Sequence, residues 1–198
     1  MFFPFKAEAL DYLRKKDPYL SKFIDKYGVI SRPIKNNVFE AIVNSILGQQ
    51  ISTSVTRVIW KRVKDKVGEV TPDSISALTI EELRACGTSF KKASNLLFIS
   101  QRFKLGEFDS LNTMNDEEVC NKLCELPGVG RWTAEMVMIH ALLREDVLSY
   151  GDAGIKKGLR IIYGIDKVTP EIFKKCKELY SPYGTIASFY IWRVANDS

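Results

Sequence analysis

The chain has 198 residues, of which 45% are hydrophobic, so it can form one large domain or two small lobes and is too apolar for a disordered protein. No apolar run approaches the length of a membrane span, and the first four residues are too few for a secretory signal. We therefore expect a cytoplasmic protein without a membrane partner. Lys and Arg number 29 against 24 Asp and Glu, a net charge of +5 that allows a polyanionic partner without requiring one.

Four cysteines, Cys86, Cys120, Cys124 and Cys176, are scattered over segments with helical patterns. No histidine or second cysteine pair completes a metal set around Cys120 and Cys124, and no terminal cysteine run is present. We expect reduced thiols, no iron–sulfur cluster and no required cofactor.

Helical patterns follow one another along the chain. The first ~35 residues predict one or two helices, broken at Asp17-Pro18 and around Pro33, which we expect to pack on the C-terminal helices. The first amphipathic stripe comprises Phe39, Ile42, Val43, Ile46 and Leu47. A second stripe comprises Val55, Val58, Ile59 and Val63.

Helix start signals recur in the second half of the chain. Thr79 with Glu82 predicts a capping box that opens a short helix, and Asn115 with Glu118 repeats the pattern. Thr169-Pro170-Glu171 is typical of a helix start with proline at the first position. Because no alternating strand pattern is sustained, the sequence predicts an all-α fold.

A turn of unusual composition, Leu126-Pro127-Gly128-Val129-Gly130, lies between two helical patterns. Both glycines allow positive φ and lack a Cβ that would keep another backbone away. Such a turn directs the N–H groups that begin the next helix outward, where they can bind phosphate. A tight helix–helix turn without a ligand is the alternative, but the flanking apolar residues favour phosphate binding.

A second turn contains Asp152, within Gly151-Asp152-Ala153-Gly154 and just before the helical pattern Ile155, Leu159, Ile162. The N-terminus of that helix favours the charged form of the carboxylate. Asp is a preferred N-cap, so the spacing alone favours a capping role.

These segments together resemble a known family. The nonapeptide LPGVGRWTA (Leu126–Ala134), the pair Gly151-Asp152, the segment Ile46–Ser52 and the tripeptide Ser181-Pro182-Tyr183 occur in the order typical of the helix-hairpin-helix (HhH-GPD) DNA glycosylase superfamily. Within it, the chain most resembles the DNA-3-methyladenine glycosylase II (AlkA) type, in the compact form without an extra N-terminal β domain.

The resemblance implies a single glycosylase domain over 1–198, with two helical lobes around a DNA-binding cleft. One lobe would be a helical subdomain of about residues 36–125. The hairpin and catalytic part, about residues 116–198, would carry the N-terminal helices 1–35 packed on it. The partner would be damaged double-stranded DNA, bound by a monomer, which in a bacterium would be nucleoid-associated.

The resemblance assigns the catalytic carboxylate to Asp152. Base excision passes through a transition state with oxocarbenium character, which an ionised carboxylate stabilises while it activates water. Bifunctional relatives carry a nucleophilic lysine where this chain has Trp132, so we expect a monofunctional enzyme that leaves an abasic site. Lys156 and Lys157 lie close to Asp152 in sequence and remain possible surrogate amines.

The resemblance also implies residues that hold the flipped base and fill the gap it leaves. The base pocket would include Trp132, Trp192, Tyr183 and Met136, where electron-rich faces suit positively charged alkylated purines. Gln50, with Gln49, would insert into the duplex as the wedge. Core aromatics and solvent-exposed amides are the alternatives. Met136 departs from the aromatic ring common in relatives.

The expected phosphate site comprises Gly128, Val129, Gly130, Arg131 and Thr133. A monovalent cation, Na⁺ or K⁺, is expected on the backbone carbonyls of Cys124, Leu126 and Val129, as family hairpins suggest. Ser89, Lys91 and Lys92 form a basic turn that either contacts the DNA backbone or is simply solvated. We assign the one histidine, His140, no role.

Three other functions remain open from the sequence. The same fold could act on mismatched or oxidised bases. The chain could also be a non-catalytic helix-hairpin-helix DNA-binding module, which Asp152 argues against. A helical scaffold for protein partners would leave the hairpin and Asp152 unexplained.

Overall fold

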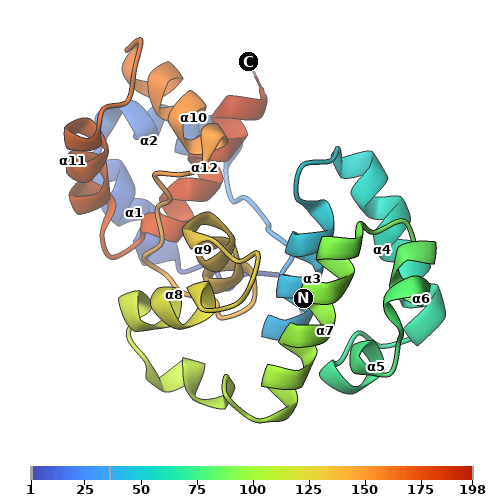
Figure 1. Cartoon of the computed structure of the whole chain (residues 1–198). Helices are drawn as coiled ribbons and strands as arrows, with labels where there is room; N and C mark the ends of the chain where they lie inside the picture. Colours follow the sequence, from blue (N-terminus) through green and yellow to red (C-terminus); the bar gives the residue numbers. More distant parts are fainter. Residues whose placement is uncertain (1, 36, 198) are drawn as a thin grey trace. The chain divides into compact units, whose positions relative to one another are not determined.

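The computed structural model describes residues 2–35 and 37–197. These residues form no β-strand, and the isolated bridge that they contain joins Phe2 to Pro33. The all-α prediction is confirmed. The chain divides into two compact units (Figure 1). We call Lys35–Val137 the central unit, and residues 2–34 with residues 138–197 the terminal unit.

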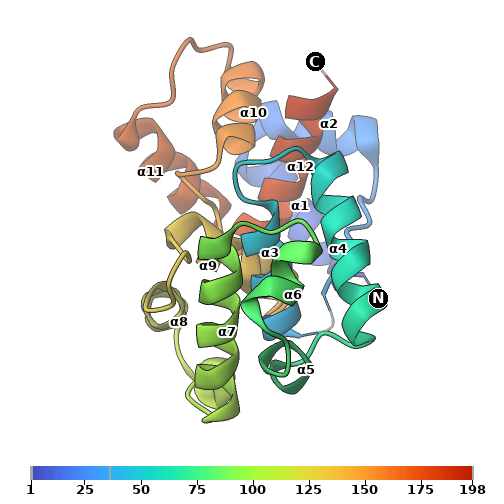
Figure 2. The same ribbon diagram turned by 45° about the vertical axis from the view of Figure 1, so that its right-hand side comes forward.

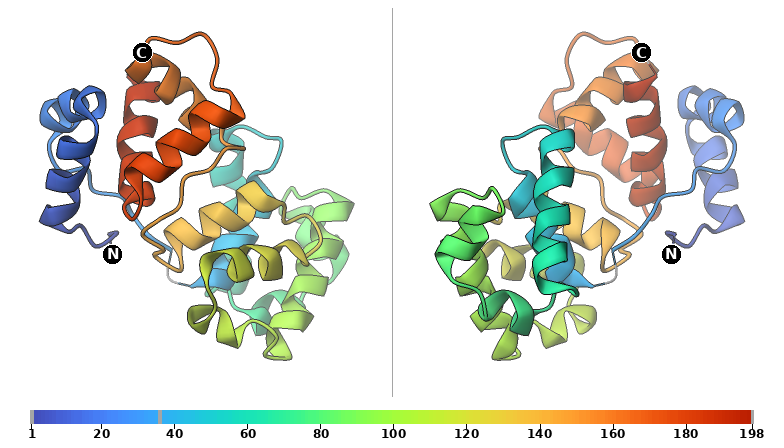
Figure 3. Two further views of the ribbon diagram at one scale, coloured as in Figure 1. Left: turned by 90° about the vertical axis from the view of Figure 1, so that its left-hand side faces the viewer. Right: turned by 90° about the vertical axis from the view of Figure 1, so that its right-hand side faces the viewer.

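The terminal unit combines the two ends of the chain. Its helices are α1 (Ala7–Lys16), α2 (Pro18–Tyr27), α10 (Ala153–Tyr163), α11 (Pro170–Tyr180), α12 (Gly184–Asn196) and the last turn of α9 (Arg131–His140). Helix α12 packs against α10 and also against α1 and α2 (Figure 3). The N-terminal helices therefore share a core with the C-terminal ones.

Asp17 separates α1 from α2, as the sequence predicts, and it also joins distant helices. One carboxylate oxygen accepts the backbone N–H groups of Tyr19 and Leu20, at 2.9 and 3.2 Å. The other accepts the hydroxyls of Tyr163 and Tyr180, at 2.6 and 2.7 Å. Burial raises the pKa of both tyrosines, so each hydroxyl stays a donor. The buried carboxylate is thus satisfied by four donors.

Helices α10 and α12 approach each other very closely at Gly158. A Cβ built on Gly158 would lie 2.2 Å from the carbonyl oxygen of Ile191. Only a residue without a side chain fits this contact, which aligns the start of α10 with the middle of α12. That alignment positions Asp152.

The central unit contains the remaining helices. They are α3 (Val38–Gly48), α4 (Thr53–Val67), α5 (Pro72–Ser76), α6 (Ile80–Ala85), α7 (Phe90–Lys104), the 3₁₀ helix η1 (Asp109–Thr113), α8 (Asp116–Cys124) and the first two turns of α9. Helix α7 packs against α3, α5 and α6 (Figure 2).

The first predicted stripe is confirmed, since all five of its residues are buried along α3. The second is only half right. Ile59 and Val63 are buried, but Val55 and Val58 are 47% and 50% exposed. Both predicted capping boxes are present, at Thr79–Glu82 and Asn115–Glu118, because each side-chain pair satisfies two backbone N–H groups.

The cysteines are free thiols in the structure. Across residues 2–35 and 37–197, no group of three or more His, Cys, Asp or Glu side chains is placed to hold a metal ion. In the same part of the chain, no helix has the length and apolarity needed to cross a membrane.

Candidate active site and nucleic-acid interface

Asp152 is the N-cap of α10 and is 8% exposed. Its Oδ1 accepts the backbone N–H of Ile155 at 2.8 Å, which confirms the capping geometry expected from the sequence. The same oxygen accepts the indole N–H of Trp192 at 2.9 Å. Two fixed donors and the helix N-terminus therefore stabilise an ionised carboxylate at this position.

Trp192 lies on α12, 40 residues from its acceptor, so no local sequence pattern indicates this bond. The ring of His140 stacks on Trp192, with centroids 6.3 Å apart and planes 16° apart. Gly154 completes the arrangement, because a Cβ there would lie 2.9 Å from Trp192 Cδ1 and 3.1 Å from Asp152 Oδ1. The glycine lets the indole reach the carboxylate.

The two lysines near Asp152 have partners of their own in the terminal unit. Lys157 Nζ donates to the carbonyl of Ala195 at 2.6 Å, at the C-terminal end of α12. Lys156 Nζ lies 4.0 Å from the centre of the Tyr150 ring, a cation–π contact. Both amines are thus committed to contacts within the fold.

Tyr183 is half-buried and contacts α1. Its ring meets that of Tyr12 edge to face, with centroids 5.3 Å apart, and its hydroxyl lies 3.5 Å from Glu8 Oε1. These contacts give Tyr183 a structural role, whatever part it has in holding a base.

The hairpin turn joins α8 to α9 and belongs to the central unit. Gly128 has φ +82°, and a Cβ there would lie 2.8 Å from Asn95 Nδ2. Gly130 lacks a positive φ, yet no heavy atom lies within 4 Å of where its Cβ would be. The first glycine is thus required by the turn, whereas the second leaves open space outside the backbone for a ligand. Val129 is buried, and its N–H donates to Leu126 within the turn at 3.0 Å.

Arg131 and Thr133 are placed differently within the expected phosphate site. The Arg131 guanidinium is exposed and holds both carboxylate oxygens of Glu117, at 3.0 and 2.8 Å. This hydrogen bonding raises the pKa of Arg131. Thr133 is 4% exposed, so its side chain faces the core. Arg131 is an exposed cation beside the turn, and its carboxylate partners, Glu117 on α8 and Glu135 on α9, compete with any anion.

Trp132 occupies the first turn of α9 and is 43% exposed. Met136, one turn further along, is half-buried. Both belong to the central unit, whereas Asp152, Trp192 and Tyr183 belong to the terminal unit.

The expected wedge loop, Gly48–Ser52, joins α3 to α4. Gln50 is exposed and has φ +59°, a left-handed conformation that is rare for a residue with a side chain. Ser52 ends the loop as the N-cap of α4. Gln49 is half-buried and donates its side-chain amide to the carbonyl of Gly128 at 2.7 Å. The structure therefore brings the expected wedge and the hairpin together.

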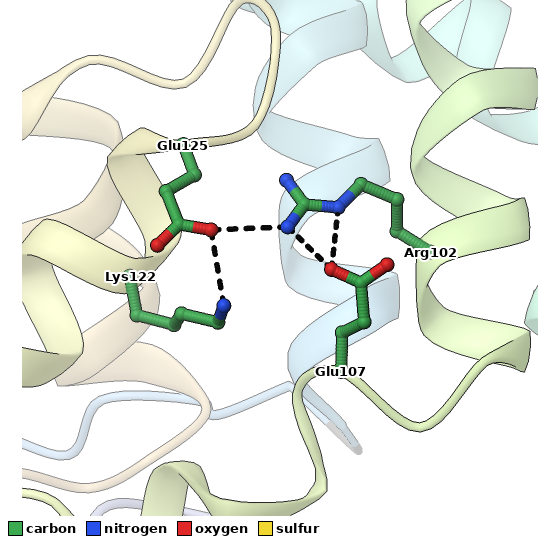
Figure 4. Close-up of polar contacts among 4 residues, drawn as sticks. All are labelled: Arg102, Glu107, Lys122 and Glu125. Atoms are coloured by element: carbon green, nitrogen blue, oxygen red, sulfur yellow. Dashed lines mark hydrogen bonds and ion pairs between the residues drawn. The ribbon is translucent and has the colours of Figure 1, made fainter.

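Four charged residues support α8, the first helix of the hairpin (Figure 4). Arg102, near the end of α7, donates to Glu107 and to Glu125, and Lys122 donates to Glu125 at 3.0 Å. Hydrogen bonds lower the pKa of Glu107, through Arg102, and of Glu125, through Lys122 first and then Arg102. No sequence pattern indicates this cluster, because its members come from α7, the segment after it, α8 and the turn.

The chain is similar to known protein families and proteins. A family model described as "HhH-GPD superfamily base excision DNA repair protein" matches residues 43–182. DNA-3-methyladenine glycosylase 1 of Schizosaccharomyces pombe is 28% identical, over 96% of this chain and 91% of that protein.

Two solved structures are similar over nearly the whole chain. The crystal structure of a DNA-3-methyladenine glycosidase from Bacillus halodurans has a TM-score of 0.87 and 30% identity, covering 98% of this chain and 92% of that one. The S. pombe 3-methyladenine DNA glycosylase Mag1, solved in complex with abasic DNA, has a TM-score of 0.83 and 26% identity, covering 94% and 96%.

Proposed function

Because the chain belongs to the HhH-GPD superfamily of base excision DNA repair proteins, we propose that it excises alkylated purines from duplex DNA. The bond broken is the N-glycosidic bond of bases of the 3-methyladenine and 7-methylguanine type, and an abasic site remains. The family resemblance drawn from separated motifs is confirmed. Similarity to DNA-3-methyladenine glycosylases along nearly the whole chain supports this substrate class.

The observation that carries the proposal is the environment of Asp152. A buried carboxylate that accepts a backbone N–H at the start of α10 and an indole N–H is fixed in place. As the base leaves with the electrons of the broken bond, positive charge develops on the sugar, and Asp152 stabilises it. Water then bonds to C1′, and Asp152 accepts its proton.

Hydrolysis by water, without a lyase step, is part of the proposal. Trp132 stands where bifunctional members of the family have a lysine, and Lys156 and Lys157 are engaged elsewhere in the fold. We propose Trp132 and Trp192 as stacking partners of the cationic base, because electron-rich rings attract positively charged purines. Tyr183 and Met136 are proposed as lesser contributors.

The hairpin is proposed to bind phosphate through backbone N–H groups at Gly128 and Gly130 and through Arg131, with buried Val129 and Thr133 supporting the turn and the helix. A Na⁺ or K⁺ on the carbonyls of Cys124, Leu126 and Val129 is a further proposal. Carbonyl oxygens are suitable ligands for such ions, and the Leu126 carbonyl would be shared with the N–H of Val129. The monomeric state and the cytoplasmic location stay predictions from the sequence.

The test is base release from duplex DNA treated with a methylating agent. We expect release of 3-methyladenine, a strand that stays intact until alkali is added, and no covalent complex after borohydride treatment. Release of oxidised or mismatched bases instead would keep the fold and change the substrate. Salt-sensitive binding to abasic DNA without release of any base would favour the non-catalytic module.

A further inference from the structure

The wedge loop contains a backbone conformation that the loop itself does not explain. Gln50 is left-handed although it has a side chain and is exposed. Such a conformation is strained and persists only where its surroundings hold it. Two groups hold this conformation through contacts at the residues just before Gln50.

Lys92, on the first turn of α7, is the first such group. Its ammonium donates to the carbonyls of Leu47 and Gln49, at 2.9 and 2.7 Å. The first carbonyl belongs to the last turn of α3, where backbone acceptors lack partners within the helix. The second belongs to the residue immediately before Gln50. Partial burial lowers the pKa of Lys92, in keeping with a side chain turned toward the protein.

Gln49 is the second group, and it extends the connection to the hairpin. Its side-chain amide donates to the Gly128 carbonyl at 2.7 Å, across 79 residues of sequence. Asn95, one helical turn after Lys92, lies against Gly128 from the same helix. One end of α7 thus contacts both the loop and the turn.

We propose that Lys92 and Gln49 are positioning residues that fix the wedge loop, Gly48–Ser52, to the hairpin. The connection rests on the proposed function, since the DNA contacts of both segments belong to it. As a consequence, the phosphate bound at Gly130 is held at a fixed position relative to the base step into which Gln50 inserts. Neither Lys92 nor Gln49 needs to contact DNA.

The test compares Lys92→Met with Lys91→Met. Lys91 is the exposed neighbour, so both variants lose one positive charge from the same helical turn. In the free protein, we expect amide hydrogen exchange of residues 48 and 49, at the end of α3, to rise about tenfold in K92M and to stay at the wild-type rate in K91M. Gln49→Met, which removes the amide donor without changing charge, should raise exchange in the same residues.

DNA binding provides the second readout. K92M should lose about tenfold in affinity for a duplex with a tetrahydrofuran abasic analogue, yet match K91M on the undamaged duplex. Equal behaviour of K91M and K92M in both measurements would overturn the proposal. If wild type did not prefer the abasic duplex, the proposed function would fail, whereas the exchange data on free protein would still decide the positioning role.

Discussion

Asp152 is buried where α10 meets α12, whereas Gln50 is exposed in a loop between α3 and α4. Asp152 is fixed by the close packing of α10 and α12 at Gly158 and by the indole N–H of Trp192. The loop around Gln50 is fixed by hydrogen bonds, one from Lys92 on α7 to Gln49 and one from Gln49 to Gly128 in the hairpin. Charge stabilisation requires a group that does not move, so it is built into a core. Contact with DNA requires exposed groups, so these depend on local polar bonds. Changes around Asp152 should therefore affect stability and rate, and changes in the wedge loop and the hairpin turn should affect DNA affinity.

The largest effect on stability is expected for Gly158→Ala. Its methyl group would lie 2.2 Å from a backbone oxygen that cannot move without shifting α12. We expect a loss of about 3 kcal/mol in the free energy of unfolding, measured by urea denaturation. The control is Gly164→Ala at the end of α10, where φ is +63° and no atom is near. It should cost only about 1 kcal/mol. Equal losses would show that the α10–α12 contact is not tight.

Trp192→Phe should lower the rate of base release about tenfold, because it keeps an aromatic ring and removes the N–H bonded to Asp152. Single-turnover kinetics on methylated duplex measure this effect. Trp60→Phe, in the central unit, is the matched control and should leave the rate unchanged. A wild-type rate in W192F would show that the hydrogen bond from the indole to Asp152 does not contribute to catalysis.

Gly130→Ala tests the opposite behaviour in the central unit. The added methyl group would meet open space, and the φ of Gly130 is not positive. Stability should therefore change by less than about 0.5 kcal/mol. The methyl group would, however, stand between the turn and a phosphate. We expect affinity for undamaged duplex to fall about fivefold, measured by fluorescence anisotropy. Unchanged affinity would remove this turn from the DNA interface.

Arg102→Gln should have the smallest effect, a fall of about 2–3 °C in Tm. The pKa values of Glu107 and Glu125 are lowered in the folded state, so their contribution is present above the ordinary carboxyl pKa and is lost as pH falls through the lowered values. The Tm difference should therefore be constant above about pH 5 and shrink below about pH 4. It should also shrink in high salt. A difference that persists at low pH would point to packing of Arg102 on Phe108 instead.

Local signals in the sequence predicted much of this fold, because capping and periodicity depend on residues three or four apart. The capping box at Asn115 and the Asp152 cap are examples. The bond from Trp192 to Asp152 and the contacts of Lys92 join segments 40 or more residues apart, so no local pattern carries them. The prediction of a buried stripe was wrong at Val55 for a related reason, since helical periodicity indicates an apolar stripe but not which neighbouring element covers it.

We propose that Asp152 is a catalytic carboxylate as well as a helix cap. Asp152→Asn tests it directly, because asparagine caps helices as well as aspartate and can accept the same two N–H groups. The measurement combines the single-turnover rate of 3-methyladenine release with the free energy of unfolding. Thr169→Ala, which removes the cap of α11, is the control and should lose about 1 kcal/mol of stability at an unchanged rate.

For D152N, we expect a rate at least about 100-fold lower, with stability within about 1 kcal/mol of wild type. A folded D152N protein that releases 3-methyladenine at the wild-type rate would contradict the proposal and leave Asp152 a cap alone.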